Sequence, residues 1–489
     1  MNGLDVKGGR LRISDKEGGI LTVITRKVRG VIDMYGQRVK LIKVIIVFML
    51  CLMILVPNPT ITEAETVQQY PTYTFSYPRK LQYASSVDEP LVSNGVITSF
   101  LASNGSDSYF PGQLRRIKAP PYLLNSSNDA TLFSWGYDDR GYFETNYKKF
   151  TMDYSLAGLT NHIDRAQSGS NYWKIDINYK AIPNKRIIVA NYSFTNIDTN
   201  NHELKIAASL QNPQITKTIT GWSWDPPGTG SINASYNSNI GSGAIISNST
   251  SNDAYLAFGL NVPVSSYSVT TNNEFTPWKS NGEFTNSPSV SNAASHFQYL
   301  SHSFGTVEPG QTVNMSAIIS IGGTQSEAQT NYLDTYNNLE SQLDQTTQYW
   351  NQQWMNSNYE VVTPDPAINR MSNLAHTTSL LSLDTLNDTW ITGFGNYARG
   401  VTYLWDTNYT RNGFIRTNSP IVKDTLIKLL NLNLTGNYAY RITDQASLGP
   451  YYAYNQFAII QLIYTYVTNT GDYAFLNQVV KGNKTVSIF

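Results

Sequence analysis

Residues Tyr403–Tyr409 read Tyr-Leu-Trp-Asp-Thr-Asn-Tyr, so a carboxylate stands directly beside an indole. Downstream, Ser419-Pro420 is a helix-start signal, and apolar residues follow it at helical spacing. Residues Thr470–Leu476 read Thr-Gly-Asp-Tyr-Ala-Phe-Leu, in which the glycine ends one helix and the aspartate caps the next. These segments predict that the last part of the chain consists of helices joined by loops.

The helical pattern begins well before this region. Thr324 and Glu327 form a capping box at its start. Apolar residues then recur at helical spacing at Tyr332, Tyr336, Leu339, Leu343, Trp350 and Trp354. The pattern predicts one long amphipathic linker helix over residues 324–358.

Further helices are predicted within residues 364–489. Asp365-Pro366 is an N-cap followed by a proline at the first helical position. The residues expected on the buried face of that helix are Ile368, Met371, Ala375 and Leu381. The residues expected on the buried face of the helix after Ser419-Pro420 are Val422, Leu426, Leu429 and Leu430. A helix from Pro450 to about Thr468 is apolar on nearly every side, so we expect it to lie inside a bundle.

Residues 70–322 show a different pattern. Trp173, Ile175, Ile177 and Tyr179 alternate with polar residues, which predicts a strand with one buried and one exposed face. Similar short runs recur between turns rich in Asn, Gly, Ser and Pro. We therefore predict a multidomain chain of β then α class, with a large two-sheet β-sandwich over 70–322 before the linker helix.

Composition narrows the class of ligand. Hydrophobic residues are 41% of the 489 residues, which indicates a globular protein, but charged residues are only 14%. The first 64 residues hold ten Lys and Arg and five Asp and Glu, which leaves 25 of the 35 basic and 30 of the 35 acidic residues beyond them. A neutral, polar and mildly acidic surface suits a saccharide, and it argues against nucleic acid as a partner.

The N-terminus predicts export. Basic residues precede the apolar run 44–56, which has the length of a signal-peptide core. We expect residues 34–64 to be a signal peptide with Ala64 at the cleavage site, or else a membrane anchor through residues 41–56. Residues 1–33 precede Met34 and are expected to be an upstream extension from a misread start. The body would then lie outside the cytoplasm, either secreted or anchored to the outer face of the membrane.

Two other features agree with that compartment. The only cysteine, Cys51, lies inside the apolar run, so the exported part has neither a disulfide nor a thiol nucleophile. The glycosylation sequons, which predict a glycoprotein, are at Asn104, Asn125, Asn191, Asn233, Asn248, Asn314, Asn387, Asn408, Asn433 and Asn483.

The order of motifs resembles a known group of inverting glycoside hydrolases. In that group a β-sandwich precedes an (α/α)6 toroid, also called the six-hairpin glycosidase fold, and it includes processing α-glucosidases, mannosylglycerate hydrolases, trehalases and archaeal glucoamylases. The segments that carry the resemblance are Arg399–Asp406, Ser419-Pro420 and Thr470–Leu476. The resemblance implies that residues 364–489 form the N-terminal part of a toroid. It also implies that Asp406 holds a sugar rather than donating a proton.

The physical chemistry of these residues agrees with saccharide binding. Trp405 offers a flat apolar face to a pyranose, and Asp406 accepts hydroxyl hydrogen bonds in a charge-assisted geometry. Arg399 and Tyr403 are close enough in sequence to orient that carboxylate. The alternative is a tryptophan packed at a helix-loop junction beside an aspartate that caps the next turn.

Two further segments have both a structural and a functional interpretation. Asp444-Gln445 falls where the resembled families carry a polar motif, so Gln445 is a candidate substrate contact, although a helix-entry loop is the simpler interpretation. The tryptophans of Gly221–Pro227 either stack on sugar or pack between domains.

The catalytic carboxylates are not assigned from the sequence. Inverting hydrolysis needs an acid and a base ~6.5–9.5 Å apart. In the resembled families the base lies late in the toroid, whereas this chain ends after four or five recognisable helices of twelve. We expect an incomplete chain that pairs with a complementary C-terminal half or forms a homo-oligomer, because helix faces such as Phe457, Ile460 and Tyr464 would be exposed.

Two functions from different classes remain open. The first is an exported glycosidase that acts on α-glucosides or short oligosaccharides without a metal or organic cofactor. The second is a non-catalytic cell-surface carbohydrate-binding or envelope protein derived from a hydrolase. A metal enzyme is disfavoured because the five histidines have no metal-ligand spacing.

Overall fold

The computed structural model describes 17 segments of the chain, which are residues 70–77, 88–93, 96–101, 114–119, 122–123, 131–145, 150–164, 172–211, 231–250, 254–357, 361–381, 383–384, 389–390, 401–432, 439–441, 447–449 and 453–487. The chain divides into two compact units, Met1–Glu65 and Thr66–Phe489, and all of these segments belong to the second. The predicted upstream extension, signal peptide and anchor lie outside the described residues. Within the described residues, no helix has the length and hydropathy needed to cross a membrane.

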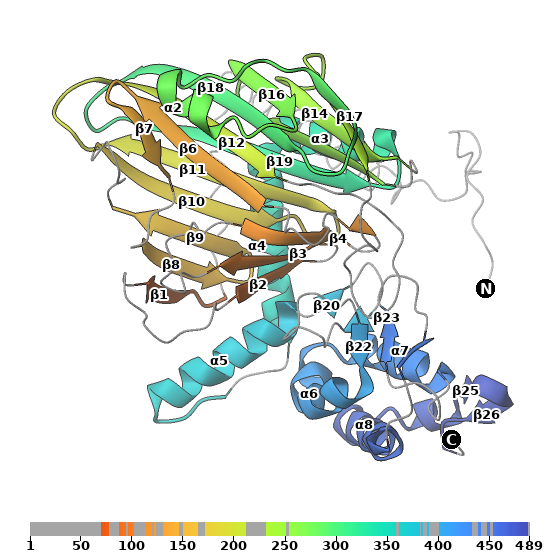
Figure 1. Cartoon of the computed structure of the whole chain (residues 1–489). Helices are drawn as coiled ribbons and strands as arrows, with labels where there is room; N and C mark the ends of the chain where they lie inside the picture. The colour runs from red at the N-terminus through yellow and green to blue at the C-terminus, as the bar shows by residue number, and fades with distance from the viewer. Residues whose placement is uncertain are drawn as a thin grey trace, which may run out of the picture. The chain divides into compact units, whose positions relative to one another are not determined.

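Two large antiparallel sheets form the N-terminal part of the described chain (Figure 1). The first sheet has the order β1 (Tyr73–Tyr77), β8 (Phe150–Ser155), β9 (Gly158–Ile163), β10 (Trp173–Ala181), β11 (Ile187–Asn196), β19 (Thr312–Gly322), β15 (Tyr255–Leu260), β14 (Ala244–Ser249), β13 (Ile232–Asn237) and β17 (Ser289–Ala293). The second sheet has the order β16 (Ser266–Thr270), β18 (Phe297–Val307), β12 (His202–Gln211), β6 (Thr131–Asp138), β4 (Leu114–Ala119), β3 (Val96–Leu101) and β2 (Asp88–Ser93). Strand β5 (Tyr122–Leu123) pairs with β4, and β7 (Gly141–Glu144) pairs with β6.

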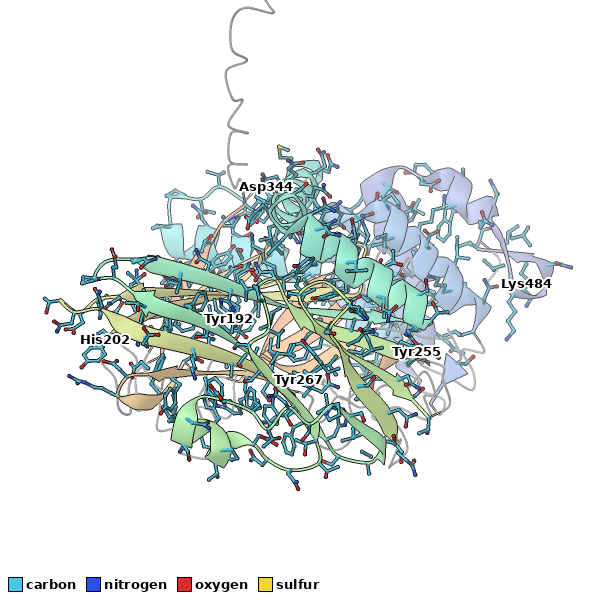
Figure 2. All side chains as sticks on the ribbon, turned by 90° about the horizontal axis from the view of Figure 1, so that it is seen from above. Tyr192, His202, Tyr255, Tyr267, Asp344 and Lys484 are labelled. Carbon is cyan, nitrogen blue, oxygen red and sulfur yellow. The ribbon has the colours of Figure 1, made fainter. Side chains whose placement is uncertain are left out.

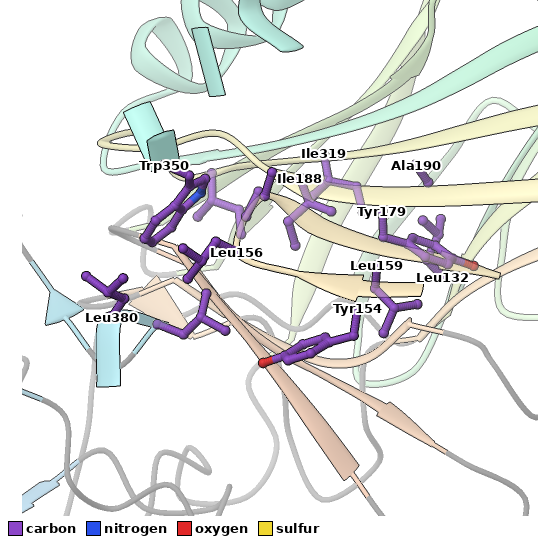
Figure 3. Packing of buried hydrophobic residues seen from close by; sticks show 14 of the residues in the cluster. Leu132, Tyr154, Leu156, Leu159, Tyr179, Ile188, Ala190, Ile319, Trp350 and Leu380 are labelled. Carbon is purple, nitrogen blue, oxygen red and sulfur yellow. The ribbon is translucent and has the colours of Figure 1, made fainter. Parts of the chain in front are cut away.

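The predicted alternation in β10 is confirmed. Trp173, Ile175, Ile177 and Tyr179 are fully buried, whereas the polar residues between them are partly or fully exposed. Their buried faces join one apolar core, to which Leu132, Tyr154 and Ile319 also belong (Figure 3). In the stick view Tyr192 lies among the strands, and Lys484 projects from the periphery of the helical region (Figure 2). The apolar core that contains the buried face of β10 positions the helices that follow.

A second cluster covers the outer face of the second sheet. Helix α2 (Phe275–Asn281) buries Trp278 against Phe284 at a ring separation of 4.8 Å. Phe284 in turn stacks on Tyr299 of β18, also at 4.8 Å. The cluster therefore covers the outer face of the second sheet, and the linker helices take no part in it.

The linker is two helices, so the prediction of one continuous helix is wrong. Helices α3 (Gln325–Asn337) and α4 (Leu339–Asn356) meet at Asn338, whose φ of −128° and ψ of 32° are not helical. The side chain of Asn338 bonds back to the carbonyl oxygen of Asp334, which competes with continuation of the helix. The predicted cap at Thr324 is confirmed, since its hydroxyl accepts from the backbone NH of Glu327 at 3.1 Å.

Helix α5 (Pro366–Leu381) starts where Asp365-Pro366 predicts, but its predicted buried face is partly wrong. Leu381 is buried, whereas Ile368 is 44% exposed, Met371 is 68% exposed and Ala375 is also exposed. The buried side of the helix is instead built around the polar residue His376.

Hydrogen bonds explain why α5 turns His376 inward. The imidazole Nε2 pairs with the Ser357 hydroxyl at 2.6 Å and Nδ1 with the Thr417 hydroxyl at 3.3 Å. The ring also contacts Trp354 at 4.7 Å between centroids. Burial lowers the pKa of His376 to about 4, so the imidazole is neutral at pH 7. The apolar periodicity of the sequence does not predict that His376 is buried and hydrogen-bonded.

Three helices and short strands complete the described chain. The helices are α6 (Leu404–Thr417), α7 (Ser419–Asn431) and α8 (Tyr454–Thr470), followed by the 3-10 turns η1 (Tyr473–Asn477) and η2 (Lys481–Asn483). The short strands are β20 (Leu383–Asp384), β21 (Thr389–Trp390), β22 (Val401–Tyr403), β23 (Ala439–Arg441), β24 (Ser447–Leu448), β25 (Val479–Val480) and β26 (Lys484–Thr485). The predicted core of α7 is confirmed, because Val422, Leu426, Leu429 and Leu430 are buried. Its N-cap is Asn418, one residue before the predicted signal.

Asp472 joins three elements and has the structural role that the sequence predicted. Its carboxylate caps η1 at the Phe475 NH, accepts from the Lys423 ammonium at 2.7 Å and accepts from the Tyr466 hydroxyl at 2.9 Å. Gly471, at a φ of 70°, ends α8 in the left-handed conformation that glycine favours. The bond from Lys423 is the main reason that the pKa of Asp472 is lowered from its ordinary value.

This geometry predicts an acid-sensitive contribution to stability. A lowered folded pKa stabilises the protein above the ordinary aspartate pKa of ~4, and the contribution is lost as the pH falls through the folded value. Asp472→Asn should therefore lower the Tm at pH 7 and have progressively less effect below about pH 4. Thermal unfolding of both proteins across this range measures the difference. A Tm difference that is constant with pH would contradict the assigned ion pair.

Candidate functional site

Trp405 and Asp406 occupy the first turn of α6, directly after β22. Tyr403 ends the strand and is the N-cap residue of the helix, and its carbonyl oxygen accepts from the Thr407 hydroxyl at 2.7 Å. Trp405 is 38% exposed, so the indole is not packed in the interior. The strand-to-helix junction thus presents an indole and a carboxylate on successive residues at a helix N-terminus.

The Asp406 carboxylate is half-buried. Among the described residues it has no hydrogen-bond donor and no cationic partner, and burial raises its pKa from the ordinary value. Burying a carboxylate without a partner costs free energy, because the charge loses hydration and gains no compensating bond. A group in this state is well suited to accept hydrogen bonds from a bound ligand.

Three aromatic side chains extend the surface around Trp405. Together with Trp405 we call them the aromatic platform, which consists of Trp405, Tyr409, Tyr454 and Phe457. The Trp405 ring lies 5.9 Å from Tyr409 and 5.5 Å from Tyr454 between centroids. Tyr409 and Tyr454 are nearly parallel, at 8° and 6.0 Å. The platform therefore spans α6 and α8, which come from distant parts of the sequence.

Asn408 connects the two helices beneath the platform. It is fully buried, and its amide nitrogen donates to the Tyr454 hydroxyl at 2.7 Å and to Gln461 Oε1 at 2.8 Å. Arg411 donates to the Asn408 carbonyl oxygen at 2.5 Å and to the Thr465 hydroxyl at 3.2 Å. Asn408 is one of the predicted glycosylation sites, but its buried, doubly bonded amide leaves no room for a glycan in the folded chain.

The structure describes only some of the predicted site residues. It places Tyr403, Trp405 and Asp406 at one junction, whereas Arg399 and Gln445 lie outside the described residues, as do Asp444 and the tryptophans of Gly221–Pro227. Substrate binding by the five predicted residues therefore stays a prediction, and so does the cavity in front of them. Within the described residues, no group of three His, Cys, Asp or Glu side chains is arranged to hold a metal ion.

The sequence analysis missed Tyr409, Tyr454 and Phe457 as parts of this surface. A local signal existed for Tyr409, which lies four residues after Trp405 and so shares its helix face. No local signal links Tyr454 to Trp405, because their contact depends on the packing of α8 against α6. The packing of α8 against α6 also buries Asn408, which then links the two helices by hydrogen bonds.

Comparisons with known proteins agree with the observed architecture. No family model matches the chain, and no curated protein matches it in sequence. One solved structure that matches is assigned as a kojibiose phosphorylase from the human microbiome, with a TM-score of 0.50 and 12% identity over 80% of this chain and 55% of that one. Another is a bacterial glucoamylase complexed with acarbose, with a TM-score of 0.47 and 13% identity over 81% of this chain and 59% of that one.

The chain therefore shares the fold of the first of these structures, in which a large β-sandwich precedes an (α/α)6 toroid. At 12% identity the likeness shows the fold and does not transfer an activity. The chain spans little more than half the length of these two structures. The predicted fold class, a β-sandwich followed by the first part of a toroid, is confirmed at this level, whereas the residue boundaries predicted for the domains remain predictions.

Proposed function

We propose that this protein is an exported glycoside hydrolase that acts on α-glucosides or short oligosaccharides. The observation that carries the proposal is the pairing of Trp405 with Asp406, an exposed indole beside a half-buried carboxylate that has no partner among the described residues. Aromatic faces stack on the apolar side of a pyranose, and a carboxylate accepts its hydroxyl hydrogens. The fold shared with a protein assigned as a kojibiose phosphorylase supports a carbohydrate substrate.

Water is the proposed acceptor in this reaction. A phosphorylase would instead need cationic groups that hold inorganic phosphate beside the sugar. Arg411, on the same helix as Asp406, already donates to Asn408 and Thr465. These two bonds occupy its guanidinium group, so Arg411 is not the proposed phosphate ligand. Single displacement by water inverts the anomeric centre and requires a general acid and a general base, which are not assigned among the described residues.

A carbohydrate-binding protein without catalysis is the second candidate. The observation that favours it is that stacking and hydrogen bonding by the aromatic platform and Asp406 require no acid-base pair. Such a protein would bind the same oligosaccharides and release no sugar.

A glycoside screen with the full-length chain separates these functions. The chain is incubated with a panel of α-linked glucosides and oligosaccharides, with and without inorganic phosphate, and the products are resolved by chromatography. We expect free sugar in the absence of phosphate, with inverted anomeric configuration by NMR. Sugar phosphate formed only with phosphate would identify a phosphorylase. Calorimetric binding without products would favour the second candidate, and neither binding nor products would contradict the proposal.

A further inference from the structure

His202, the first residue of β12, is buried between two carboxylates. Its side chain is only 4% exposed, and its Nδ1 lies 2.9 Å from Asp139 Oδ1 while its Nε2 lies 2.8 Å from Asp198 Oδ2. Tyr172 stacks on the imidazole at 3.8 Å between centroids and an angle of 12°. Figure 2 shows His202 at the edge of the strands. Both ring nitrogens are therefore directed at groups that, when ionised, only accept hydrogen bonds.

The segments that meet at His202 come from both sheets. Asp139 lies in the turn between β6 and β7 of the second sheet, and Tyr172 directly precedes β10 of the first. Asp198 lies in the turn that connects β11 of the first sheet to β12 of the second. We call His202, Asp139 and Asp198 the His202 clasp. It fixes these segments to one another beside the buried Trp173, whose ring lies 6.3 Å from that of His202.

The number of hydrogens on the imidazole decides how many of these bonds form. An imidazolium carries a hydrogen on each ring nitrogen and donates to both carboxylates, whereas a neutral imidazole has a single donor. In the neutral form, one nitrogen lone pair faces a carboxylate oxygen, and a charge-assisted bond is replaced by repulsion. The pKa of Asp198 is lowered from its ordinary value mainly by its bond with His202, so this carboxylate remains ionised at pH 5.

Two further charged residues lie beside the clasp. Arg140 Cζ lies 4.2 Å from the centre of the Tyr172 ring. Asp138 accepts from the Trp173 indole NH and from the Arg140 backbone NH, each at 2.9 Å. Strand β18 pairs the apolar Val307 with the clasp histidine. Among the described residues, no lysine or arginine forms an ion pair with either clasp carboxylate, so within this part of the chain the imidazole is the group that balances their charge.

We propose that the His202 clasp is a proton-sensitive switch, which holds this end of the sandwich closed while His202 is protonated and releases it when the proton is lost. A fold that favours the protonated form of a histidine gains stability below the ordinary histidine pKa of ~6.5 and loses it as the pH rises through deprotonation of the folded form. This direction is opposite to that of the Asp472 contribution, which is lost in acid.

His162 offers a matched comparison in the same protein. Its ring nitrogens also face two carboxylates, those of Asp176 at 2.6 Å and Asp153 at 3.1 Å. However, the His162 side chain is 33% exposed, and the two carboxylates lie on β10 and β8, which the backbone ladder already joins to β9. Exposed ion pairs contribute little to stability, because water and salt screen them. We therefore expect no comparable switch at His162.

Thermal unfolding of the full-length chain between about pH 5 and pH 9 tests the proposal. His202→Gln is the main variant, because glutamine does not titrate and can still donate to one carboxylate, as the neutral imidazole does. The Tm difference between wild type and variant should be largest at pH 5 and should shrink by ~3 °C or more by pH 9. For His162→Gln the difference should change by ~1 °C or less over the same range.

Asp198→Asn tests the switch without altering the histidine. An asparagine side chain accepts from an imidazolium and, after rotation of the amide, donates to a neutral imidazole. The variant should therefore lose less stability than the wild type when the pH is raised. An alkaline loss of stability equal to that of the wild type would overturn the proposal.

Hydrogen exchange measured by mass spectrometry locates the opening. Wild type and His202→Gln are compared at the same pH, so that the intrinsic pH dependence of exchange cancels. Residues 138–141 and 196–202 should be ~10-fold more protected in the wild type at pH 5, and the two proteins should converge by pH 9. A Tm difference that does not vary with pH, or equal protection of these segments at pH 5, would overturn the proposal. These outcomes are independent of the glycoside screen.

Discussion

Asp406→Asn is expected to lower turnover of the preferred glycoside by ~10²–10⁴-fold, which corresponds to the loss of two charge-assisted hydrogen bonds to sugar hydroxyls at ~1.5–3 kcal/mol each. The substitution keeps the shape of the side chain but removes the charge and replaces one acceptor with a donor. The loss should appear in kcat/KM, because the sugar is held through the transition state. Initial rates with the glycoside identified in the screen provide the measurement.

The same substitution should leave the fold intact. Burial raises the pKa of Asp406, so folding disfavours its ionised form. A raised folded pKa gives an unfavourable contribution at neutral pH, which disappears when the carboxyl is protonated in both states at low pH. Asp406→Asn should therefore unfold at the same temperature as the wild type at pH 7, or at a higher one. Any advantage of the variant should shrink on acidification.

Asp424→Asn supplies the matched control for activity. Asp424 is an exposed residue of α7, and the chemical change is identical. Full turnover in Asp424→Asn with a strong loss in Asp406→Asn would assign the effect to the site. Unchanged turnover in Asp406→Asn would remove Asp406 from the proposed site.

Trp173→Ala should have the largest effect on stability. The indole is fully buried in β10, and its ring lies 6.3 Å from Phe143 in a stacked arrangement. Removing a buried aromatic side chain of this size costs ~3–5 kcal/mol in the free energy of unfolding. The indole NH also donates to Asp138 Oδ2 at 2.9 Å, and Asp138 is only 2% exposed. Leaving that oxygen without its donor adds ~1–3 kcal/mol.

Two variants separate the packing contribution of Trp173 from its hydrogen-bond contribution. Trp173→Phe keeps most of the ring and removes the donor, so guanidinium unfolding should show the smaller loss of ~1–3 kcal/mol. Trp405→Ala removes an equally large but partly exposed indole and should cost much less. If Trp405→Ala destabilised the protein as strongly as Trp173→Ala, the Trp405 side chain would be a core residue, and the saccharide platform would be refuted.

Alternation and capping made much of the fold predictable. Period-two alternation at Trp173, Ile175 and Ile177 identifies a strand with one buried face, because one side of the sheet must be apolar. Cap residues such as Thr324 and Asp472 fix helix starts through short-range hydrogen bonds, which a local sequence contains. The exposure predicted for Phe457, Ile460 and Tyr464 is also confirmed.

Most of the failures involve contacts between distant segments, and one involves a local hydrogen bond. The outward position of Met371 follows from the inward position of His376, which depends on Ser357 and Thr417 from other elements. The break at Asn338 is a local competition for a carbonyl oxygen that a helical periodicity does not reveal. Likewise, the sequence identified Trp405 and Asp406 but not Tyr454, because only the packing of α8 on α6 brings that ring to the site.

A crystal structure of the full-length chain with a hydrolysis-resistant thio-linked α-glucoside tests the saccharide site most directly. The site described above predicts a sugar ring stacked on the Trp405 indole, with a hydroxyl within hydrogen-bond distance of an Asp406 carboxylate oxygen. A sugar bound elsewhere on the chain, with the Trp405 face covered by protein, would contradict it.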